Sequence, residues 1–372
     1  MFIKGIGHSK FTFSLKSSIE LACEVIIEAI NNSKMELCDL DAIVVSNIDI
    51  FTNGEHQRHT PGLYSQIFKL NIPIIRIPAA CASGSAALFV ANKLGYDNIL
   101  VVATEKLKSM ATNDITEELA FAGEELYEQE EGLNFPAQNA LIANIYMKKY
   151  GVTEDDLNLV AMKNYEFAKE NELAFFSGKS MDLDKIKSSP LICTPLRLHH
   201  CSISVDGAVA VVLTKKKTDV EIVGSSLIED SMSFFERDDF TSWKAPKMAA
   251  QEAYKQAGIG PNDLDVVELH DAFSSVELIA YEDLGFCNPG DAKYLIRNGE
   301  TSFEGRLPVN TSGGLKAKGH PISVTGLSQI AWLVKQLRGE AGKFQVKNPI
   351  YALAHNVGGV GTTGVVHILK KV

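Results

Sequence analysis

The spacing of hydrophobic residues predicts alternating helices and strands along most of the chain. Residues 17–49 (SSIELACEVIIEAINNSKMELCDLDAIVVSNID) join a helical period to an apolar run, which predicts an amphipathic helix, a turn and a buried strand. Residues 247–273 (KMAAQEAYKQAGIGPNDLDVVELHDAF) repeat that order, and DLDVVEL echoes DLDAIVV at the start of the strand. Because an internal repeat in sequence often means a repeated architecture, we expect two similar halves.

The parallel between the halves continues further along the chain. Strands are predicted at residues 98–104 (NILVVAT) and 349–355 (PIYALAH), each after a helical stretch. Alternation of strands and helices is typical of mostly parallel sheets covered by helices. We therefore expect an α/β fold in which two such units stack back to back.

Residues 112–204 differ from both halves, because they carry helical patterns and few strand signals. We interpret them as an inserted loop or lid domain. Residues 205–216 (VDGAVAVVLTKK) then predict a strand that returns to the first sheet. The predicted division is a first half at 1–111 completed by 205–216, the insertion, and a second half at 217–372.

Composition narrows the class of protein. The 372 residues carry a formal net charge of −10, which argues against a nucleic-acid surface. We see no apolar run of about 18 residues and no secretory signal, so no membrane partner and a cytoplasmic location are expected. The six cysteines form no C-x-x-C pair, and the adjacent His199, His200 and Cys201 are poorly spaced to converge on one ion, so we expect no metal and reduced thiols.

Cys81 stands in PAACASGSAAL (78–88), where a predicted strand leads into a predicted helix. The small neighbours allow a sharp turn like a nucleophile elbow, and a helix N-terminus favours thiolate over thiol. Such a thiol can attack an acyl carbon while neighbouring amides bind the oxyanion. The alternative is a buried cysteine with a structural role only.

Three histidines follow predicted strands or loops of the second half, and each is a candidate base for Cys81. They are His270 in ELHDAF, His320 in KGHPIS and His355 in LAHNVGGVG. Active sites of open α/β sheets lie beyond the carboxyl ends of the strands, where His270 and His355 fall. Neutral imidazole is a suitable proton acceptor near pH 7.

Two glycine-rich loops accompany the histidines. HNVGGVGTTG (355–364) offers exposed amides for a second oxyanion site, and NTSGGLKAKGHP (310–321) offers another glycine pair. Neither matches a phosphate-binding loop. The candidates for substrate binding in these loops are Ser312, Gly313, Lys318, Gly358 and Gly359.

Together these motifs resemble the thiolases, more closely the sterol-carrier-protein-type and archaeal acetoacetyl-CoA thiolases than the common biosynthetic kind. The resemblance covers nearly the whole chain and depends on ACASGSAA, HDAF, NTSGGLKAKGHP and HNVGGVG. It implies a five-layer αβαβα fold and at least a dimer. It also implies that Cys81 takes the acetyl group as a thioester, that His320 activates Cys81, and that His270 helps to bind the thioester oxygen.

The chain departs from the thiolase pattern in two places. Common thiolases have a second cysteine at the position we align with His355, and sterol-carrier-type relatives have one in H-D-C-F, where this chain has Ala272. We therefore hypothesise that His355 is the base that removes the C2 proton. Ser323 and Val324 replace smaller residues of G-H-P-x-G-A-T-G, which would narrow the acyl pocket or alter the start of the helix.

The resemblance implies an acetyl-CoA C-acetyltransferase that condenses two acetyl-CoA into acetoacetyl-CoA and feeds the mevalonate route. Coenzyme A thioesters would be substrates, and no cofactor is expected. The implied partners are a second copy in a homodimer or tetramer, and HMG-CoA synthase joined through a small zinc-ribbon and OB-fold protein. Two alternatives stay open, a degradative 3-ketoacyl-CoA thiolase for longer chains and a non-catalytic thiolase-like scaffold.

Overall fold

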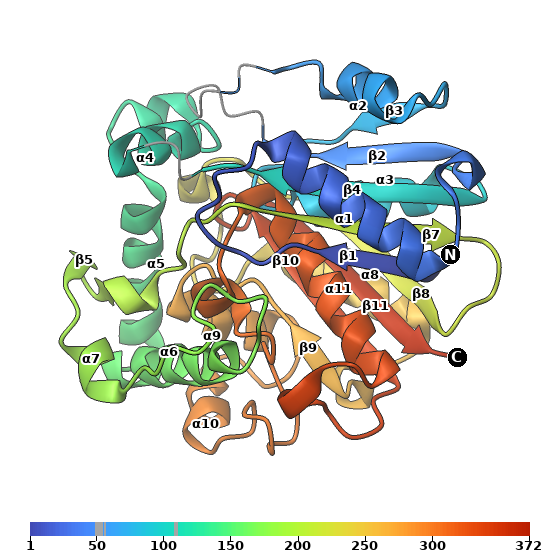
Figure 1. Ribbon diagram of the computed structural model, residues 1–372. Helices are drawn as coiled ribbons and strands as arrows, with labels where there is room; N and C mark the ends of the chain where they lie inside the picture. The colour runs from blue at the N-terminus through green and yellow to red at the C-terminus, as the bar shows by residue number, and fades with distance from the viewer. Residues whose placement is uncertain (49–54, 56, 108–110) are drawn as a thin grey trace.

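A nine-stranded sheet runs through the whole molecule, with the strand order β3-β2-β4-β7-β1-β8-β11-β10-β9 (Figure 1). The computed structural model describes residues 1–48, 55, 57–107 and 111–372. The strands of this sheet are β1 (Phe2–His8), β2 (Ala42–Ser46), β3 (Ile74–Arg76), β4 (Asn98–Glu105), β7 (Gly207–Thr214), β8 (Val220–Glu229), β9 (Val266–Glu268), β10 (Tyr351–Gly358) and β11 (Thr363–Lys371).

The strand order confirms the two similar halves that the repeat predicts. In the first half the order is β2-β4-β7-β1, and in the second half the corresponding strands have the order β9-β10-β11-β8. One outer helix and one inner helix of each half occupy equivalent places in the chain. These helices are α1 (Ser18–Ser33) and α3 (Ser83–Lys93) in the first half, and α8 (Lys244–Ala257) and α11 (Thr325–Arg338) in the second.

The helices and sheet regions form the five layers of an αβαβα sandwich. Helix α1 covers the outer face of β1, β4 and β7, while α8 covers the outer face of β8 and β11. Helices α3 and α11 contact each other and strands of both halves, so they form the central layer. The halves also meet edge to edge, where β1 pairs with β8 at Phe2↔Glu221 and Ile3↔Val220.

Strand β4 shows why the strands of the large sheet have continuously apolar sequences. Leu100 and Val102 belong to the hydrophobic cluster under α1, whereas Ile99, Val101 and Ala103 belong to the cluster around α3 and α11. A strand that is covered on both faces has no polar side to show in its sequence. The NILVVAT prediction is therefore confirmed as a buried strand.

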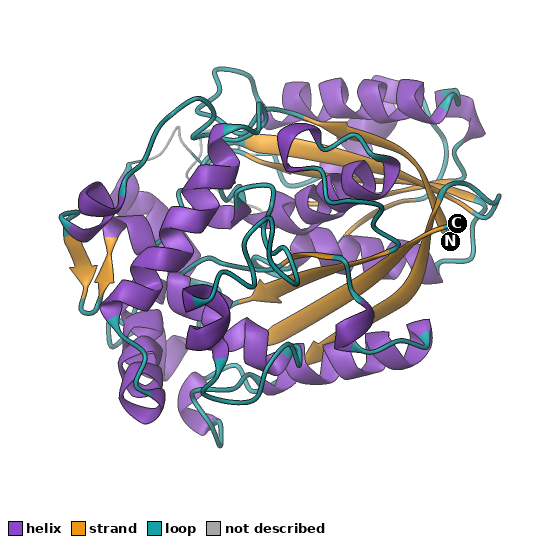
Figure 2. Ribbon diagram, turned by 90° about the horizontal axis from the view of Figure 1, so that it is seen from below, coloured by secondary structure: helices purple, strands orange, loops and turns teal. Residues whose placement is uncertain are grey.

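Most of residues 112–204 are helical and lie at the end of the molecule opposite the two termini (Figure 1). The region contributes a small two-stranded sheet that stands apart from the large sheet (Figure 2). Its elements are α4 (Thr112–Ala120), α5 (Phe135–Tyr150), α6 (Glu154–Lys169), α7 (Leu183–Lys187), β5 (Leu191–Cys193) and β6 (Leu196–Arg197). The division of the chain into three parts at 111, 204 and 216 stays a prediction.

Three further helices complete the α-helices of the described residues. They are α2 (Thr60–Phe68), which precedes β3, and α9 (Ser274–Asp283) and α10 (Ala292–Arg297), which follow β9. Across the described ranges, no helix combines the length and apolar character needed to cross a bilayer.

Glycine allows the two central helices to approach each other closely. A Cβ atom placed on Gly84 of α3 would lie 2.6 Å from the backbone oxygen of Ser323 and 3.1 Å from the backbone nitrogen of Leu327. Gly326 faces α3 in the same way, against the side chains of Ser85 and Asn356. This close approach brings the N-terminal ends of α3 and α11 together.

We predict that Gly84→Ala destabilises the protein. Alanine normally stabilises a helix by about 1 kcal/mol relative to glycine, but overpacking against backbone costs about 1–3 kcal/mol. The second effect should dominate because the obstructing atoms belong to the backbone. Chemical denaturation should therefore show a lower free energy of unfolding.

The matched control is Gly260→Ala, because a Cβ atom there has only Asp263 Oδ2 within 4 Å, at 3.8 Å. This variant should stay within about 0.5 kcal/mol of the wild type. Equal stability of the two variants would contradict the close packing of α3 against α11.

Candidate active site

A cavity of about 1000 Å³ brings together the predicted nucleophile and two of the three predicted histidines. Cys81, His270 and His320 line it, together with the glycine turn at Gly358 and Gly359. Much of the remaining wall is apolar and includes Phe135, Phe176, Trp243 and Phe273. The cavity therefore combines a thiol, two imidazoles and backbone amides inside a largely apolar enclosure.

The turn that presents Cys81 is held by the hydroxyl group of Ser83. Ala80 adopts the left-handed conformation with φ 46°, which is uncommon for a residue with a side chain. The Ser83 hydroxyl accepts a hydrogen bond from the Ala79 N–H at 2.7 Å and donates one to the Ala80 carbonyl at 2.6 Å. The strained elbow that the small residues predict is thus present at the N-terminus of α3, and Ser83 fixes it.

The environment keeps Cys81 as a thiol in the resting protein. Burial, followed by the negative charge of Glu105, raises the pKa of Cys81 to about 12. The backbone N–H groups of Cys81 and Gly359 act in the opposite direction and lower this pKa, but they do not outweigh burial. The helix N-terminus alone therefore does not supply a standing thiolate, and attack on an acyl carbon requires a base.

His320 and His270 are neutral neighbours in the cavity. Their ring centroids lie 5.4 Å apart with the planes nearly perpendicular. Burial lowers the pKa of His320 to about 3 and lowers the pKa of His270 well below its ordinary value. The hydroxyl group of Thr325 lies 2.7 Å from His320 Nδ1 and orients the ring. Two neutral imidazoles give the site both proton-accepting and hydrogen-bond-donating capacity at neutral pH.

His355 lies outside the cavity lining among the described residues, which removes the geometric support for its predicted role as base. Its ring faces the backbone of the neighbouring strand, where Nδ1 accepts a long hydrogen bond of 3.5 Å from the His270 N–H. The next residue, Asn356, points to the other face of β10 and contacts the ring of His270 at 2.9 Å. Asn356 also lies outside the cavity lining, so its link to the site is the contact with the His270 ring, which does line the cavity.

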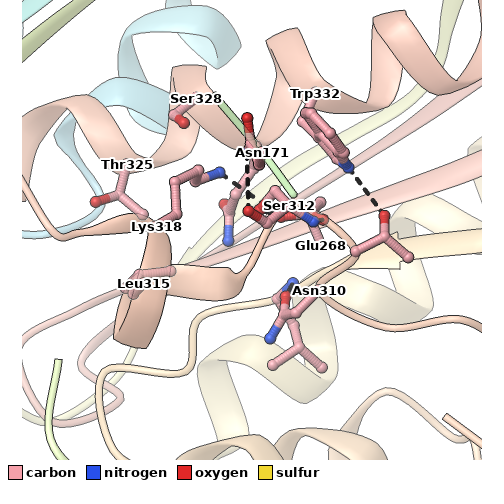
Figure 3. A network of polar contacts seen from close by, with 12 residues as sticks. Asn171, Glu268, Asn310, Ser312, Leu315, Lys318, Thr325, Ser328 and Trp332 are labelled. Carbon is pink, nitrogen blue, oxygen red and sulfur yellow. Dashed lines mark hydrogen bonds and ion pairs between the residues drawn. The ribbon is translucent and has the colours of Figure 1, made fainter. Parts of the chain in front are cut away.

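Three of the predicted substrate-binding residues lie outside the cavity wall, and two of them, Ser312 and Lys318, belong to a buried polar network (Figure 3). The Ser312 hydroxyl and N–H both donate to the Glu268 carboxylate, and Lys318 Nζ lies 3.7 Å from it. Gly313, with φ 103°, packs against Ala168 of α6. These residues anchor the loop that carries His320, while Gly358 and Gly359 do line the cavity.

Asp271 supports the site from outside the cavity lining, and it is not predicted from the sequence. Its carboxylate accepts hydrogen bonds from the Leu315 N–H at 2.6 Å, the Lys316 N–H at 3.2 Å and the Asn164 amide at 2.8 Å. Burial, and next the charge of Glu277, raises the pKa of Asp271. Asp271 therefore ties the strand end that carries His270 to the loop that carries His320. The HDAF motif contains the signal, but the pattern alone assigns a role only to its histidine.

The two bulky replacements after His320 do not narrow the cavity, because neither Ser323 nor Val324 lines it. They form a single 3-10 turn, Ile322–Val324, that precedes α11. Ser323 instead contacts the buried carboxylate of Glu105 through its hydroxyl and N–H groups. Burial raises the pKa of Glu105 to about 7, and these Ser323 groups act against that rise.

Three basic residues, Lys316, Arg197 and Lys244, could in principle bind phosphates of coenzyme A, but two of them are engaged elsewhere. Lys316 is fully buried and donates to the His200 carbonyl, while Arg197 pairs with Glu154. Lys244 is exposed at the start of α8. As for metals, the parts of the chain that the structure describes contain no group of three His, Cys, Asp or Glu side chains arranged to hold an ion.

A thiol at a helix N-terminus, with neutral imidazoles and amides around it, is an arrangement that suits acyl transfer. Residues 227–371 match the family described as thiolase C-terminal domain-like. The chain is 37% identical over 381 residues to the acetyl-CoA acetyltransferase of Methanothermobacter thermautotrophicus, covering 99% of this chain and 98% of that protein. The chain therefore belongs to the thiolase family and is an acyltransferase.

Other relatives agree with this assignment. The acetyl-CoA acetyltransferase of Methanocaldococcus jannaschii is 34% identical, with 99% of this chain and 98% of that protein covered. Sterol carrier protein 2 of Bos taurus is 31% identical, and the match covers 100% of this chain and 72% of that protein. Both groups are those that the sequence motifs resemble.

Two solved structures share the fold of this chain. The Ltp2-ChsH2(DUF35) aldolase contains a chain with a TM-score of 0.84 and 27% identity, covering 100% of this chain and 97% of its own. Human mitochondrial 3-ketoacyl-CoA thiolase has a TM-score of 0.75, covering 100% of this chain and 98% of its own. At 16% identity the second likeness supports the fold alone.

We predict that alkylation of Cys81 by iodoacetamide accelerates steadily between about pH 7 and about pH 10, because the reactive thiolate fraction grows as pH approaches a raised pKa. Peptide mass spectrometry would follow Cys81 separately from the other cysteines. A rate that levels off below about pH 8 would reveal a standing thiolate and contradict the burial effect.

Proposed function

We propose that this thiolase condenses two molecules of acetyl-CoA into acetoacetyl-CoA through an acetyl-Cys81 thioester. The observation that carries the proposal is the enclosed juxtaposition of Cys81 with neutral His270 and His320. The 34–37% identity to two acetyl-CoA acetyltransferases supports acetyl-CoA as the substrate.

In the first half-reaction, the Cys81 sulfur attacks the thioester carbon of acetyl-CoA. His320 accepts the thiol proton as the C–S bond forms, which overcomes the high pKa of Cys81. The N–H groups of Cys81 and Gly359, which face the sulfur, are placed to stabilise the oxyanion. His320 then gives the proton to the departing coenzyme A thiolate, and the acetyl group remains on Cys81.

In the second half-reaction, a base removes a proton from C2 of the second acetyl-CoA, and the carbanion attacks the acetyl-Cys81 carbonyl. Because His355 lies outside the cavity lining among the described residues, we assign this step to His320, which is neutral again after coenzyme A departs. His320 returns the proton to the Cys81 thiolate as the C–S bond breaks. His270 donates a hydrogen bond to the thioester oxygen of the second acetyl-CoA.

The degradative alternative has one observation in its favour, the size and apolar wall of the cavity. About 1000 Å³ exceeds what an acetyl group alone occupies, so acyl chains longer than acetyl would find space beside the pantetheine arm. Activity that rises with acyl-chain length would favour cleavage of 3-ketoacyl-CoA over condensation of acetyl-CoA.

The condensation needs a process that removes its product, because it is thermodynamically unfavourable from acetyl-CoA. We propose a cytoplasmic role at the start of the mevalonate route, with HMG-CoA synthase as the consuming partner. The Ltp2-ChsH2(DUF35) aldolase supports a small bridging protein, because its name joins a similar chain to a DUF35 component. The homodimer or tetramer stays a prediction, and the acyltransferase relatives argue against a purely non-catalytic scaffold.

We predict a single acetyl adduct on the intact protein after mixing with acetyl-CoA, because the thioester intermediate is covalent. Intact-mass spectrometry should show the adduct on the wild type and not on Cys81→Ala. The same measurement with longer acyl-CoA thioesters would show which chains the cavity accepts. A wild type without any adduct would overturn the proposed reaction.

We further predict that Cys201→Ser keeps the condensation activity within about threefold of the wild type. Cys201 is a second thiol in the cavity lining, but burial raises its pKa to about 11 and its Sγ–H donates to the Arg197 carbonyl. A poorly ionised thiol held in this way is a weak proton acceptor.

The assay compares Cys201→Ser with His320→Ala for both adduct formation and condensation. His320→Ala should lose both by about 100-fold or more, the usual range for removal of a general base. If Cys201→Ser forms the adduct but no longer condenses, the residue that removes the C2 proton is Cys201 and not His320.

A further inference from the structure

We infer that Asn356 is a positioning residue that fixes the ring proton of His270 on Nε2, so that His270 can donate a hydrogen bond to the substrate oxygen. The inference rests on the proposed function for its catalytic consequence. Its structural basis does not depend on that function. This basis is the hydrogen bond between Asn356 Nδ2 and His270 Nδ1, which lie 2.9 Å apart.

Sheet register brings the two side chains together. β9 and β10 pair in parallel, with Ala354 opposite Glu268, and two residues further along Asn356 reaches the level of His270. Side chains at the same level of neighbouring parallel strands lie side by side. The absence of a side chain at Gly326 leaves room for the amide, because a Cβ atom there would collide with Asn356 Oδ1.

The chemistry of the contact assigns the tautomer. Asn356 Nδ2 carries only donors, so the His270 Nδ1 atom that it contacts must be the acceptor. A neutral imidazole has one N–H group, which then resides on Nε2. Both side chains are buried, with Asn356 fully enclosed, so water does not compete for the contact.

The opposite side of the Asn356 amide faces the central helices. Its Oδ1 atom has no hydrogen-bond partner among the described residues, and neither does the buried Ser85 hydroxyl of α3, which approaches Gly326 from the same side. The amide is therefore held mainly by its bond to His270. The side-chain hydrogen bond of Asn356 among the described residues is therefore the one that determines which nitrogen of the histidine is protonated.

The titratable groups that face His270 do not override this assignment. His320, before α11, and His355, on β10, both have a pKa lowered to about 3 by burial. Cys81, at the start of α3, has a pKa raised to about 12. All three are neutral across the physiological range, so His270 has no charged partner among them and stays a neutral Nε2–H donor.

The test replaces Asn356 by aspartate, which has the same shape but only accepts hydrogen bonds when it is ionised. The single substitution Asn356→Asp therefore moves the ring proton of His270 to Nδ1 and leaves Nε2 without one. At neutral pH we expect kcat to fall by about 100-fold, the usual loss for one oxyanion donor, with KM changed less than about threefold.

The pH profile separates this effect from structural damage. A carboxylate beside His270 raises the pKa of the ring, since opposite charges favour the charged form. Below that pKa the doubly protonated ring regains its Nε2–H, so activity of Asn356→Asp should recover as pH falls and be lost as pH rises. The wild type should show no such recovery. A variant that is unaffected, or equally impaired at every pH, would overturn the inference.

A second buried pair provides the matched control. His200 Nε2 lies 2.8 Å from Asn158 Oδ1, and neither residue lines the cavity. Asn158→Asp keeps an acceptor opposite His200, so its activity should follow the wild-type pH profile. Acid recovery in this variant as well would show a general effect of buried aspartate and contradict the role of Asn356.

A direct measurement does not depend on activity or on the folding of the Asn356 variant. Long-range ¹H–¹⁵N correlation spectra of the histidine-labelled wild type, with His270 assigned by the loss of its signals in His270→Gln, should show a proton on Nε2 and none on Nδ1. The opposite tautomer would overturn the inference. If the wild type forms no acetyl adduct while the spectra show Nε2–H, the proposed function fails and the positioning by Asn356 stands.

Discussion

The close approach of α3 and α11 is the constraint on which the site depends. Gly84 and Gly326 let the two helices meet at backbone distance in the central layer, where each helix also contacts strands of both halves. Cys81 precedes α3 and His320 precedes α11, so the contact brings the proposed nucleophile and its proposed base to one cavity. A larger side chain at either glycine would separate the helices and the two reacting groups with them.

Burial then determines how the site has to work. It raises the pKa of Cys81 and lowers the pKa of His320, so the two groups rest as neutral thiol and neutral imidazole instead of an ion pair. In the proposed reaction, proton transfer accompanies the attack of the thiol, and one imidazole carries the proton in both half-reactions. Buried polar networks under the loops, such as Glu268 with Ser312, keep the loop that carries His320 in place while protons are transferred.

The sequence predicts those features that depend on local pattern. The repeat at 17–49 and 247–273 predicts the two halves, and the small residues around Cys81 predict the turn that presents its thiol. Each of these patterns can be recognised within a short stretch of sequence. The assignment of His355 as base loses its support because adjacent residues of a strand point to opposite faces, and only the sheet register shows that Asn356 faces the central layer. The place of Lys318 in a buried network is equally hidden in the sequence, because its partner Glu268 is distant in the chain.

In the proposed reaction, His320 moves the proton that allows Cys81 to exchange an acyl group with coenzyme A. The most direct measurement is the exchange of labelled coenzyme A into acetyl-CoA, which requires only the first half-reaction. We expect exchange by the wild type and a loss of at least about 100-fold in His320→Ala. Exchange at an undiminished rate in His320→Ala would contradict the proposed role of His320.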